Sequence, residues 1–223
     1  GGGVNGAGIA RDASGRGLKV CLADMGDLGG ATSSASTKLF HGGLRYLEYF
    51  EFKLVKESLK EREVLLKSMP HISWPMKFVL PYNDEMRFES STPVSRLLSL
   101  IMPWNKGKRP AWLIRFGLLL YDYLGQRKIL PPSKTINLKS DCAGKPLKNK
   151  FTKAFEYSDC WIEDSRLVIL NARDAYATGA KIMPNHKVIN AKKTNEGWNV
   201  SVKNNRTLQI SNFKCKLLIN AGG

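Results

Sequence analysis

Three glycines at the start of the chain have the spacing of a dinucleotide-binding turn. The segment reads Gly1-x-Gly3-x-x-Gly6, and an acidic residue, Asp24, follows the next strand-like segment. Gly1 allows a tight turn, Gly3 lets backbone approach a pyrophosphate, and Gly6 lets a helix pack closely on a sheet. The pyrophosphate would lie at the amino end of that helix, where free N–H groups and the helix dipole attract negative charge. Asp24 would then accept a hydrogen bond from a ribose hydroxyl. A glycine-rich loop without a ligand is the alternative.

The bulk composition is that of a globular protein. The chain has 223 residues, of which 43% are hydrophobic and 24% charged, enough to form a core. No apolar run approaches the roughly 20 residues of a membrane span. The four cysteines and three histidines are dispersed, so no metal site is predicted and reduced thiols in the cytoplasm are expected. The strand that normally precedes such a glycine turn is missing, and the chain ends in another glycine turn, which indicates a fragment of a longer protein.

The chain is strongly basic, with a net charge of +16. Lysines occur along the whole chain without a signature of a nucleic-acid-binding fold, so binding to nucleic acid is not predicted. Between residues 96 and 128, basic residues alternate with Trp104, Trp112 and Phe116, which would suit an anionic lipid surface. An ordinary amphipathic helix packed on its own domain fits the pattern equally well. This stretch contains one acid, Asp122, and seven basic residues: Arg96, Lys106, Lys108, Arg109, Arg115, Arg127 and Lys128.

Local patterns predict an α/β fold with an insertion. Residues 50–69 have apolar positions at helical spacing, and residues 155–161 look like a strand. Alternating segments between residues 187 and 210, separated by turn residues, predict a small antiparallel meander beside a Rossmann-like parallel sheet. Residues 217–219 are apolar throughout and should return to that sheet. We expect a dinucleotide-binding domain made of two segments and an inserted α+β substrate domain, with bounds 1–70 and 163–223 for the former and 71–162 for the latter.

Several stretches closely resemble the FAD-dependent (aerobic, respiratory) glycerol-3-phosphate dehydrogenases. The longest are GGGVNGAG at 1–8, TSSASTKLFHGGLRYLE at 32–48 and FEYSDCW at 155–161. Shorter stretches that fit the same family are 109–112, 121–122 and 171–174. The terminal Asn-Ala-Gly-Gly departs at Gly222 from the family's Asn-Ala-Ala/Thr-Gly, and the Pro-Trp that follows there is absent.

This resemblance implies an FAD flavoprotein that oxidises sn-glycerol 3-phosphate to dihydroxyacetone phosphate and passes electrons to quinone, peripherally bound at the cytoplasmic face of the inner membrane. The C2 hydride would go to the flavin N5 while a base removes the C2 hydroxyl proton; that base is unknown and expected beyond Gly223. Arg45 and Tyr46 would reach the substrate, since a guanidinium fork matches the oxygens of a phosphate. The implied cofactor-binding residues are Gly1, Gly3, Gly6, Asp24, Ser33, Ser34, Lys38, His41, Gly42, Gly43, Ala221 and Gly222.

Simpler roles exist for some of these residues. His41 could hold the glycine turn by hydrogen bonding, and Arg45 could pair with Glu48, its i+3 neighbour in a helix. Asp159 and Asp164 could face the site, although capping of a helix explains Asp164 more simply.

Two other functions fit the sequence. An amine or amino-acid oxidase of the same fold would share the glycine turn but bind a carboxylate, and a non-catalytic basic fragment would use the glycines only as loop. The quinone and the oligomeric state, including a homodimer, stay open.

Overall fold

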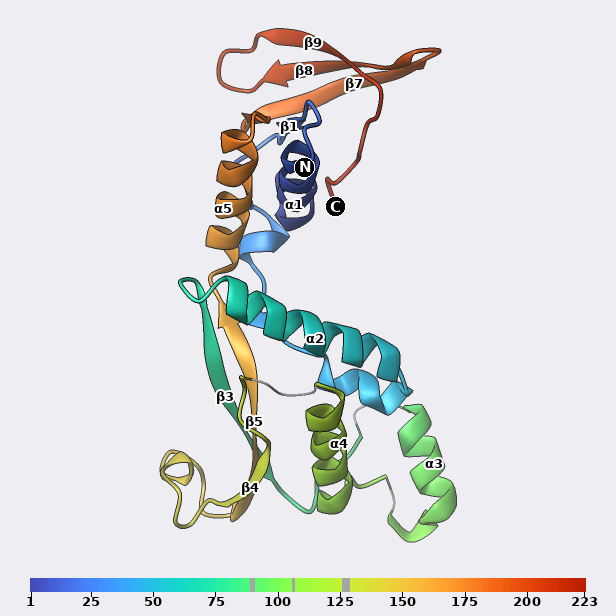
Figure 1. The fold of residues 1–223 in the computed structure, drawn as a ribbon. Helices are drawn as coiled ribbons and strands as arrows, with labels where there is room; N and C mark the ends of the chain where they lie inside the picture. Colours follow the sequence, from blue (N-terminus) through green and yellow to red (C-terminus); the bar gives the residue numbers. More distant parts are fainter. Residues whose placement is uncertain (89–90, 106, 126–128) are drawn as a thin grey trace. The chain divides into compact units, whose positions relative to one another are not determined.

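The computed structural model describes residues 1–88, 91–105, 107–125 and 129–223 (Figure 1). The chain forms two compact units: unit 1 contains residues 1–38 and 163–223, and unit 2 contains residues 39–162. The expected boundary at residue 70 therefore falls inside unit 2. The reason is strand β2 (Leu39–Phe40), which pairs with strand β5 (Lys153–Ile162), the last segment of unit 2 in sequence.

Two helices and a short parallel sheet form one part of unit 1. Helices α1 (Val4–Gly15) and α5 (Asp164–Ala177) lie side by side (Figure 1). Their contact is made by Ala7, Val168 and Ala172, and small side chains allow such a close approach. Strands β1 (Cys21–Ala23) and β6 (Lys181–Met183) pair in parallel. The sequence thus passes from the glycine turn into α1 and β1 as a dinucleotide-binding unit requires.

An antiparallel meander completes unit 1. It consists of β7 (His186–Thr194), β8 (Gly197–Asn204) and β9 (Ile210–Cys215), in that order. The expected strand at residues 217–219 is wrong, because this segment makes no ladder with a neighbouring strand and Leu217 is 73% exposed. Leu218 packs on the meander core instead.

Unit 2 is built on an antiparallel sheet centred on β5. Strand β3 (Ser73–Tyr82) pairs along the whole of one edge of β5, while β2 and β4 (Lys134–Asn137) pair with it at opposite ends. Aromatic rings stack across β3 and β5, for example Trp74 on Trp161 at 4.3 Å between ring centroids. Such cross-strand pairs fix the register of the two long strands.

Three helices of unit 2 lie on one side of this sheet (Figure 1). They are α2 (Phe52–Ser68), α3 (Pro93–Ile101) and α4 (Ala111–Leu124), with short 3-10 turns η1 (Thr32–Ser34, in unit 1), η2 (Leu44–Tyr49), η3 (Pro103–Asn105) and η4 (Cys142–Gly144). The core shared by α2, α4 and η2 contains Leu47, Val55, Leu59 and Tyr121. Within the described ranges, no helix combines the length and the apolar character that crossing a membrane requires.

Candidate functional site

The candidate residues fall into two groups, one in each compact unit. In unit 1, the first glycine turn leaves no room for side chains. A Cβ on Gly6 would lie 1.8 Å from the carbonyl oxygen of Gly1, and a Cβ on Gly1 would lie 1.9 Å from that of Ala221. Backbone atoms cannot move aside as a flexible side chain can, so Gly1 and Gly6 are required by the fold. The backbone of Ala221 and Gly222 lies against Gly1, as a shared site requires.

The amino end of α1 offers a polar surface. Gly3 is the N-cap residue and supplies no side-chain cap. The Val4 N–H donates to Oγ of Ser33 at 2.9 Å, which places this hydroxyl at the helix terminus where an anion is favoured. The Ser33 hydroxyl proton stays available for donation to a ligand, because the oxygen acts here as an acceptor.

Asp24 holds the turn together. Its Oδ2 accepts the Gly2 N–H at 2.6 Å and its Oδ1 accepts the Gly26 N–H at 2.8 Å. A carboxylate has about four acceptor positions, so capacity remains for ribose hydroxyls. The bond to Gly2 is not predictable from the glycine spacing, and through it Asp24 stabilises the turn itself.

Lys38 is tied to the start of α5. Its Nζ donates to Oδ1 of Asp164 at 2.6 Å, and Ser36 donates to the other carboxylate oxygen at 2.7 Å. Burial acts to raise the pKa of Asp164, but the hydrogen bonds from Lys38, Ser36 and the Ser165 N–H lower it to about 2. Lys38 itself has φ +57°, a conformation that costs energy in a residue with a side chain. Ser34 donates to the Ala31 carbonyl at 3.2 Å.

In unit 2, the second glycine turn is fixed by hydrogen bonds. The Gly42 N–H donates to the Tyr121 hydroxyl at 2.6 Å, and the Gly43 N–H donates to Nδ1 of the exposed His41 at 3.0 Å. Gly43 has φ +67°, and a Cβ there would lie 2.5 Å from the Tyr46 ring. His41 therefore holds the turn through Nδ1, and this hydrogen bond does not involve its Nε2 atom.

Arg45 and Tyr46 lie on η2 directly after this turn, and both are exposed. The alternative pairing of Arg45 with Glu48 competes with a strong contact: Nη2 of Arg109 lies 2.7 Å from Oε1 of Glu48.

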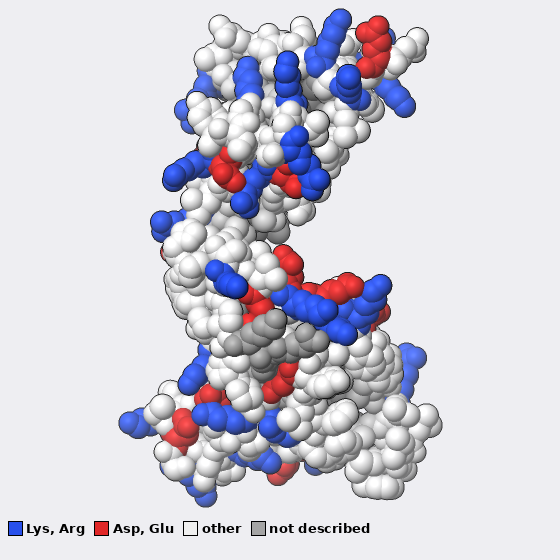
Figure 2. Space-filling model, in the orientation of Figure 1, with Lys and Arg blue, Asp and Glu red and all other residues white. Residues whose placement is uncertain are grey.

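The stretch with possible affinity for lipid is only partly described. Lys106, Arg127 and Lys128 lie outside the described residues. Arg109 pairs with Glu48, and Arg115 donates to Ser133 at 2.6 Å, so the basic side chains here are less available than the sequence implied. Figure 2 shows few charged side chains over α3 on the face drawn. The strongly exposed apolar residues of this region are Leu97, Leu100, Ile101, Trp104, Trp112 and Phe116.

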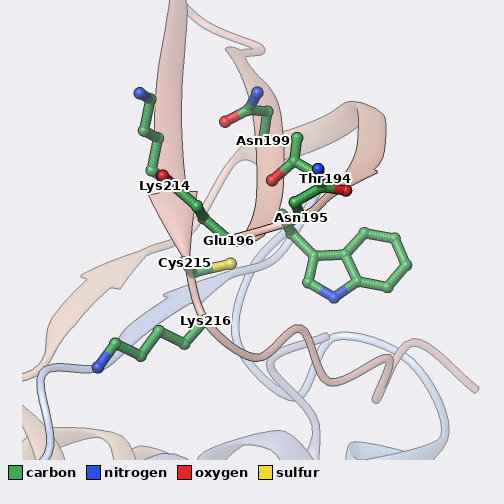
Figure 3. A pocket seen from close by; sticks show the side chains of 8 residues that line it. Thr194, Asn195, Glu196, Asn199, Lys214, Cys215 and Lys216 are labelled. Carbon is green, nitrogen blue, oxygen red and sulfur yellow. The ribbon is translucent and has the colours of Figure 1, made fainter.

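Two hollows on the described part of the surface are lined by residues other than the predicted site residues. One, of about 420 Å³, lies at the end of the meander, and Lys214 and Lys216 extend to the side opposite the Cys215 thiol (Figure 3). The other, of about 530 Å³, lies between α1 and α5 and includes Arg11 and Asp174. Among the described residues, no three His, Cys, Asp or Glu side chains are grouped so that they could hold a metal ion. The candidate residues are therefore described by the glycine turn of each unit separately.

Comparison with known proteins identifies the family of the chain. The sequence model of the family described as "FAD dependent oxidoreductase" matches residues 1–223. The chain belongs to the FAD-dependent oxidoreductases. This membership confirms the expected α/β fold class and FAD as the cofactor, and the glycine turn without side chains fits the dinucleotide part of FAD.

Within the FAD-dependent oxidoreductases, the chain is similar to dehydrogenases of phosphorylated polyols. It is 50% identical to a D-erythritol 1-phosphate dehydrogenase of Brucella abortus and 43% identical to an aerobic glycerol-3-phosphate dehydrogenase of Escherichia coli, in both cases over all of this chain and 40% of the relative. The chain thus spans about two fifths of these curated relatives. A glycerol-3-phosphate dehydrogenase of Bacillus halodurans, solved with FAD, superimposes with a TM-score of 0.63 at 24% identity, covering 97% of this chain and 32% of that one; at this identity it shows the fold alone.

One polar cluster was not found from the sequence. Arg62, Tyr121 and Asp159 lie together in the interior of unit 2. A signal existed: Arg62 shares the helical stripe of Val55 and Leu59 that faces the core, where an arginine needs a buried partner.

Proposed function

We propose that the full-length protein is an FAD-dependent dehydrogenase of a phosphorylated polyol, with sn-glycerol 3-phosphate as the substrate and dihydroxyacetone phosphate as the product. The observation that carries this proposal is the 43 to 50% identity, over the whole chain, to dehydrogenases of that substrate class. The glycine turns explain why such identity would be maintained, since side chains there collide with backbone or with core residues.

Each group of residues has a proposed role. The first turn and α1 would bind the pyrophosphate, with Asp24 on the adenosine ribose and the Ser33 hydroxyl donating to the phosphate. Arg45 would bind the substrate phosphate in a bidentate manner, which a lysine could not do, and Tyr46 would contact the substrate. The remaining proposed cofactor contacts are Ser34, Lys38, His41, Gly42, Gly43, Ala221 and Gly222.

Bound FAD would supply the hydride acceptor for the C2 hydride of the substrate, with a base to take the C2 hydroxyl proton and a membrane quinone as the proposed electron acceptor. The residues of this chain would bind and orient the reactants. The Lys38–Asp164 pair holds the loop that carries Ser33 and Ser34, so this loop would stay ordered around the cofactor.

A second substrate deserves a direct comparison. Because the identity to the D-erythritol 1-phosphate dehydrogenase is 50%, a four-carbon polyol phosphate is a candidate with the same chemistry. An amino-acid or amine oxidase of the same fold would need a carboxylate substrate.

The test is anaerobic flavin reduction in the full-length protein. Purified protein should be yellow, and sn-glycerol 3-phosphate should bleach the flavin absorbance near 450 nm, roughly as expected of a bound oxidised flavin. D-erythritol 1-phosphate, D-amino acids and N-methyl amino acids are tested beside it. If D-erythritol 1-phosphate reduces the flavin faster, it becomes the proposed substrate in place of sn-glycerol 3-phosphate. Reduction only by an amino acid would refute the proposal. Protein that takes up no flavin would favour a non-catalytic basic fragment.

The region of α3 and η3 would contact an anionic membrane at the cytoplasmic face. Leu100 and Ile101 are 81% and 63% exposed, and burying such side chains stabilises binding by about 1.5–3 kcal/mol each. Replacing both by Gln should weaken binding to phosphatidylserine vesicles at least about tenfold, whereas Leu208→Gln, at an equally exposed site in unit 1 (64%), should not. Equal binding by all three proteins would assign this surface to another contact.

A further inference from the structure

Three polar side chains form a connected cluster inside unit 2. Arg62, from α2, is 1% exposed, Tyr121, from α4, is 1% exposed, and Asp159, from β5, is 4% exposed. Nη1 of Arg62 donates to Oδ1 of Asp159 at 2.5 Å, and the Tyr121 hydroxyl donates to the same oxygen at 3.0 Å. Burial raises the pKa of Tyr121 above its usual value, so this hydroxyl keeps its proton.

The cluster ends on the second glycine turn. The Tyr121 oxygen that donates to Asp159 also accepts the Gly42 N–H at 2.6 Å. A side chain at position 42 would not fit, because a Cβ there would lie 2.3 Å from Cδ2 of Leu59 and 2.9 Å from the Tyr121 ring. The amide of Gly42 is therefore held by a hydroxyl whose own direction is set by Asp159 and, through it, by Arg62.

This arrangement determines the state of the His41 ring. The Gly43 N–H is a donor and Nδ1 of His41 accepts from it at 3.0 Å. A ring nitrogen that accepts a hydrogen bond carries no proton, so a neutral His41 in this turn carries its proton on Nε2. Nε2–H is then a hydrogen-bond donor that the turn itself does not use. Movement of Gly42 would displace the Gly43 N–H, and His41 could then carry its proton on either ring nitrogen.

We propose that Tyr121 and Asp159 are positioning residues: acting through Gly42, they keep His41 in the Nε2–H tautomer, so that it donates a hydrogen bond to an acceptor atom of the bound flavin. This rests on the proposed function, in which the second glycine turn contacts the cofactor. A donor at the flavin stabilises the negative charge that accumulates on reduction. Loss of the tyrosine hydroxyl therefore lowers the flavin midpoint potential as well as the rate.

The experiment compares Tyr121→Phe with Tyr123→Phe in the full-length, FAD-loaded protein. Both changes remove one hydroxyl from α4, but Tyr123 is 80% exposed. Histidine labelled with ¹⁵N, with the His41 signals assigned through a His41→Gln variant, reports the tautomer. In Tyr121→Phe, we expect a mixture of His41 tautomers, a more negative flavin potential and a kcat lower by roughly ten- to a hundredfold, the effect of misplacing a group at the site, with KM changed less. Tyr123→Phe should match the unmodified protein.

Several results would overturn the inference. The first is that His41 of the unmodified protein carries its proton on Nδ1. The second is that Tyr121→Phe has the same His41 tautomer and the same flavin potential as Tyr123→Phe. If Tyr121→Phe does not fold, Asp159→Asn gives the same comparison, because it keeps the tyrosine but weakens the acceptor that orients its hydroxyl. The NMR measurement needs no substrate. A protein that shows the expected tautomer but is not reduced by a polyol phosphate would therefore refute the proposed function and not the role of the cluster.

Discussion

Replacing Arg62 by Met tests how strongly the buried charge pair stabilises unit 2. Arg62 lies within hydrogen-bonding distance of Asp159 and of the Ser158 carbonyl oxygen, 2.5 Å and 3.2 Å away, with almost no exposure to water. Methionine occupies a similar space without charge, so the change removes the partner and leaves the carboxylate. Because an uncompensated buried charge is strongly destabilising, we expect a loss of about 3–5 kcal/mol.

Native-state hydrogen exchange in the full-length protein is the appropriate assay. It measures opening of α2 and β5 amides separately and does not require the whole protein to unfold in one step. The matched control is Arg16→Met. Arg16 pairs with Asp12 at 2.8 Å, but their side chains are 73% and 66% exposed, so water replaces the lost partner and exchange should not change measurably.

The pH dependence and a second change separate charge from packing. Burial raises the pKa of Asp159, while Arg62 lowers it. Without Arg62 the carboxyl should titrate at still higher pH in the folded protein. Since a folded-state pKa above the unfolded value favours folding at low pH, the variant should lose stability as pH rises through that pKa. Adding Asp159→Asn should restore at least about 1 kcal/mol, because the unpaired buried charge at position 159 is removed. A loss below about 1 kcal/mol for Arg62→Met, or a further loss with Asp159→Asn, would refute this reasoning.

Three further outcomes are expected. Gly3→Ala should fold but lose flavin on purification, whereas Gly6→Ala should lose stability and Gly8→Ala, with open space around it, should change neither; flavin-to-protein ratios and thermal melting distinguish the three. The pKa of Asp164 is about 2 in the folded protein and 3.8 as a reference value. Its contribution to stability is therefore present above about pH 5 and is lost as pH falls. The difference in melting temperature between Asp164→Asn and the unmodified protein should accordingly shrink from about pH 5 to about pH 3. Gly43→Ala should slow flavin reduction, because φ +67° and the Tyr46 ring both oppose a side chain, and an unchanged rate would show that the turn tolerates movement.

Local patterns predicted the elements whose partners are near in sequence. The helix over residues 50–69 became α2, because apolar positions at helical spacing need only one core face. The meander followed from alternation and turn residues in one continuous stretch. The first glycine turn was likewise readable, since its three glycines and Asp24 lie within one continuous stretch of 24 residues.

Long-range pairing explains what the sequence did not reveal. Strand β2 has two residues, and its partner is Trp161 with Cys160, so nothing in its own composition marked the start of unit 2. The Tyr121–Asp159 bond similarly joins an apolar helix to a strand residue that lies 38 residues further along the chain. Asp159 was considered as a residue facing the site, but its charge instead supports the turn from inside the unit.

The glycines of the first turn differ in what they imply about a ligand. Gly1 and Gly6 face backbone oxygens at less than 2 Å from a hypothetical Cβ, so the fold alone requires them, with or without a cofactor. Gly3 is different: its φ of −77° and ψ of −173° suit any residue, and the nearest atom to a Cβ would be the Ser33 hydroxyl oxygen at 3.0 Å. A small shift of that side chain would accommodate alanine. The structure therefore gives little internal reason for glycine at position 3, and in the proposed function the approach of a pyrophosphate to bare backbone would supply the missing one.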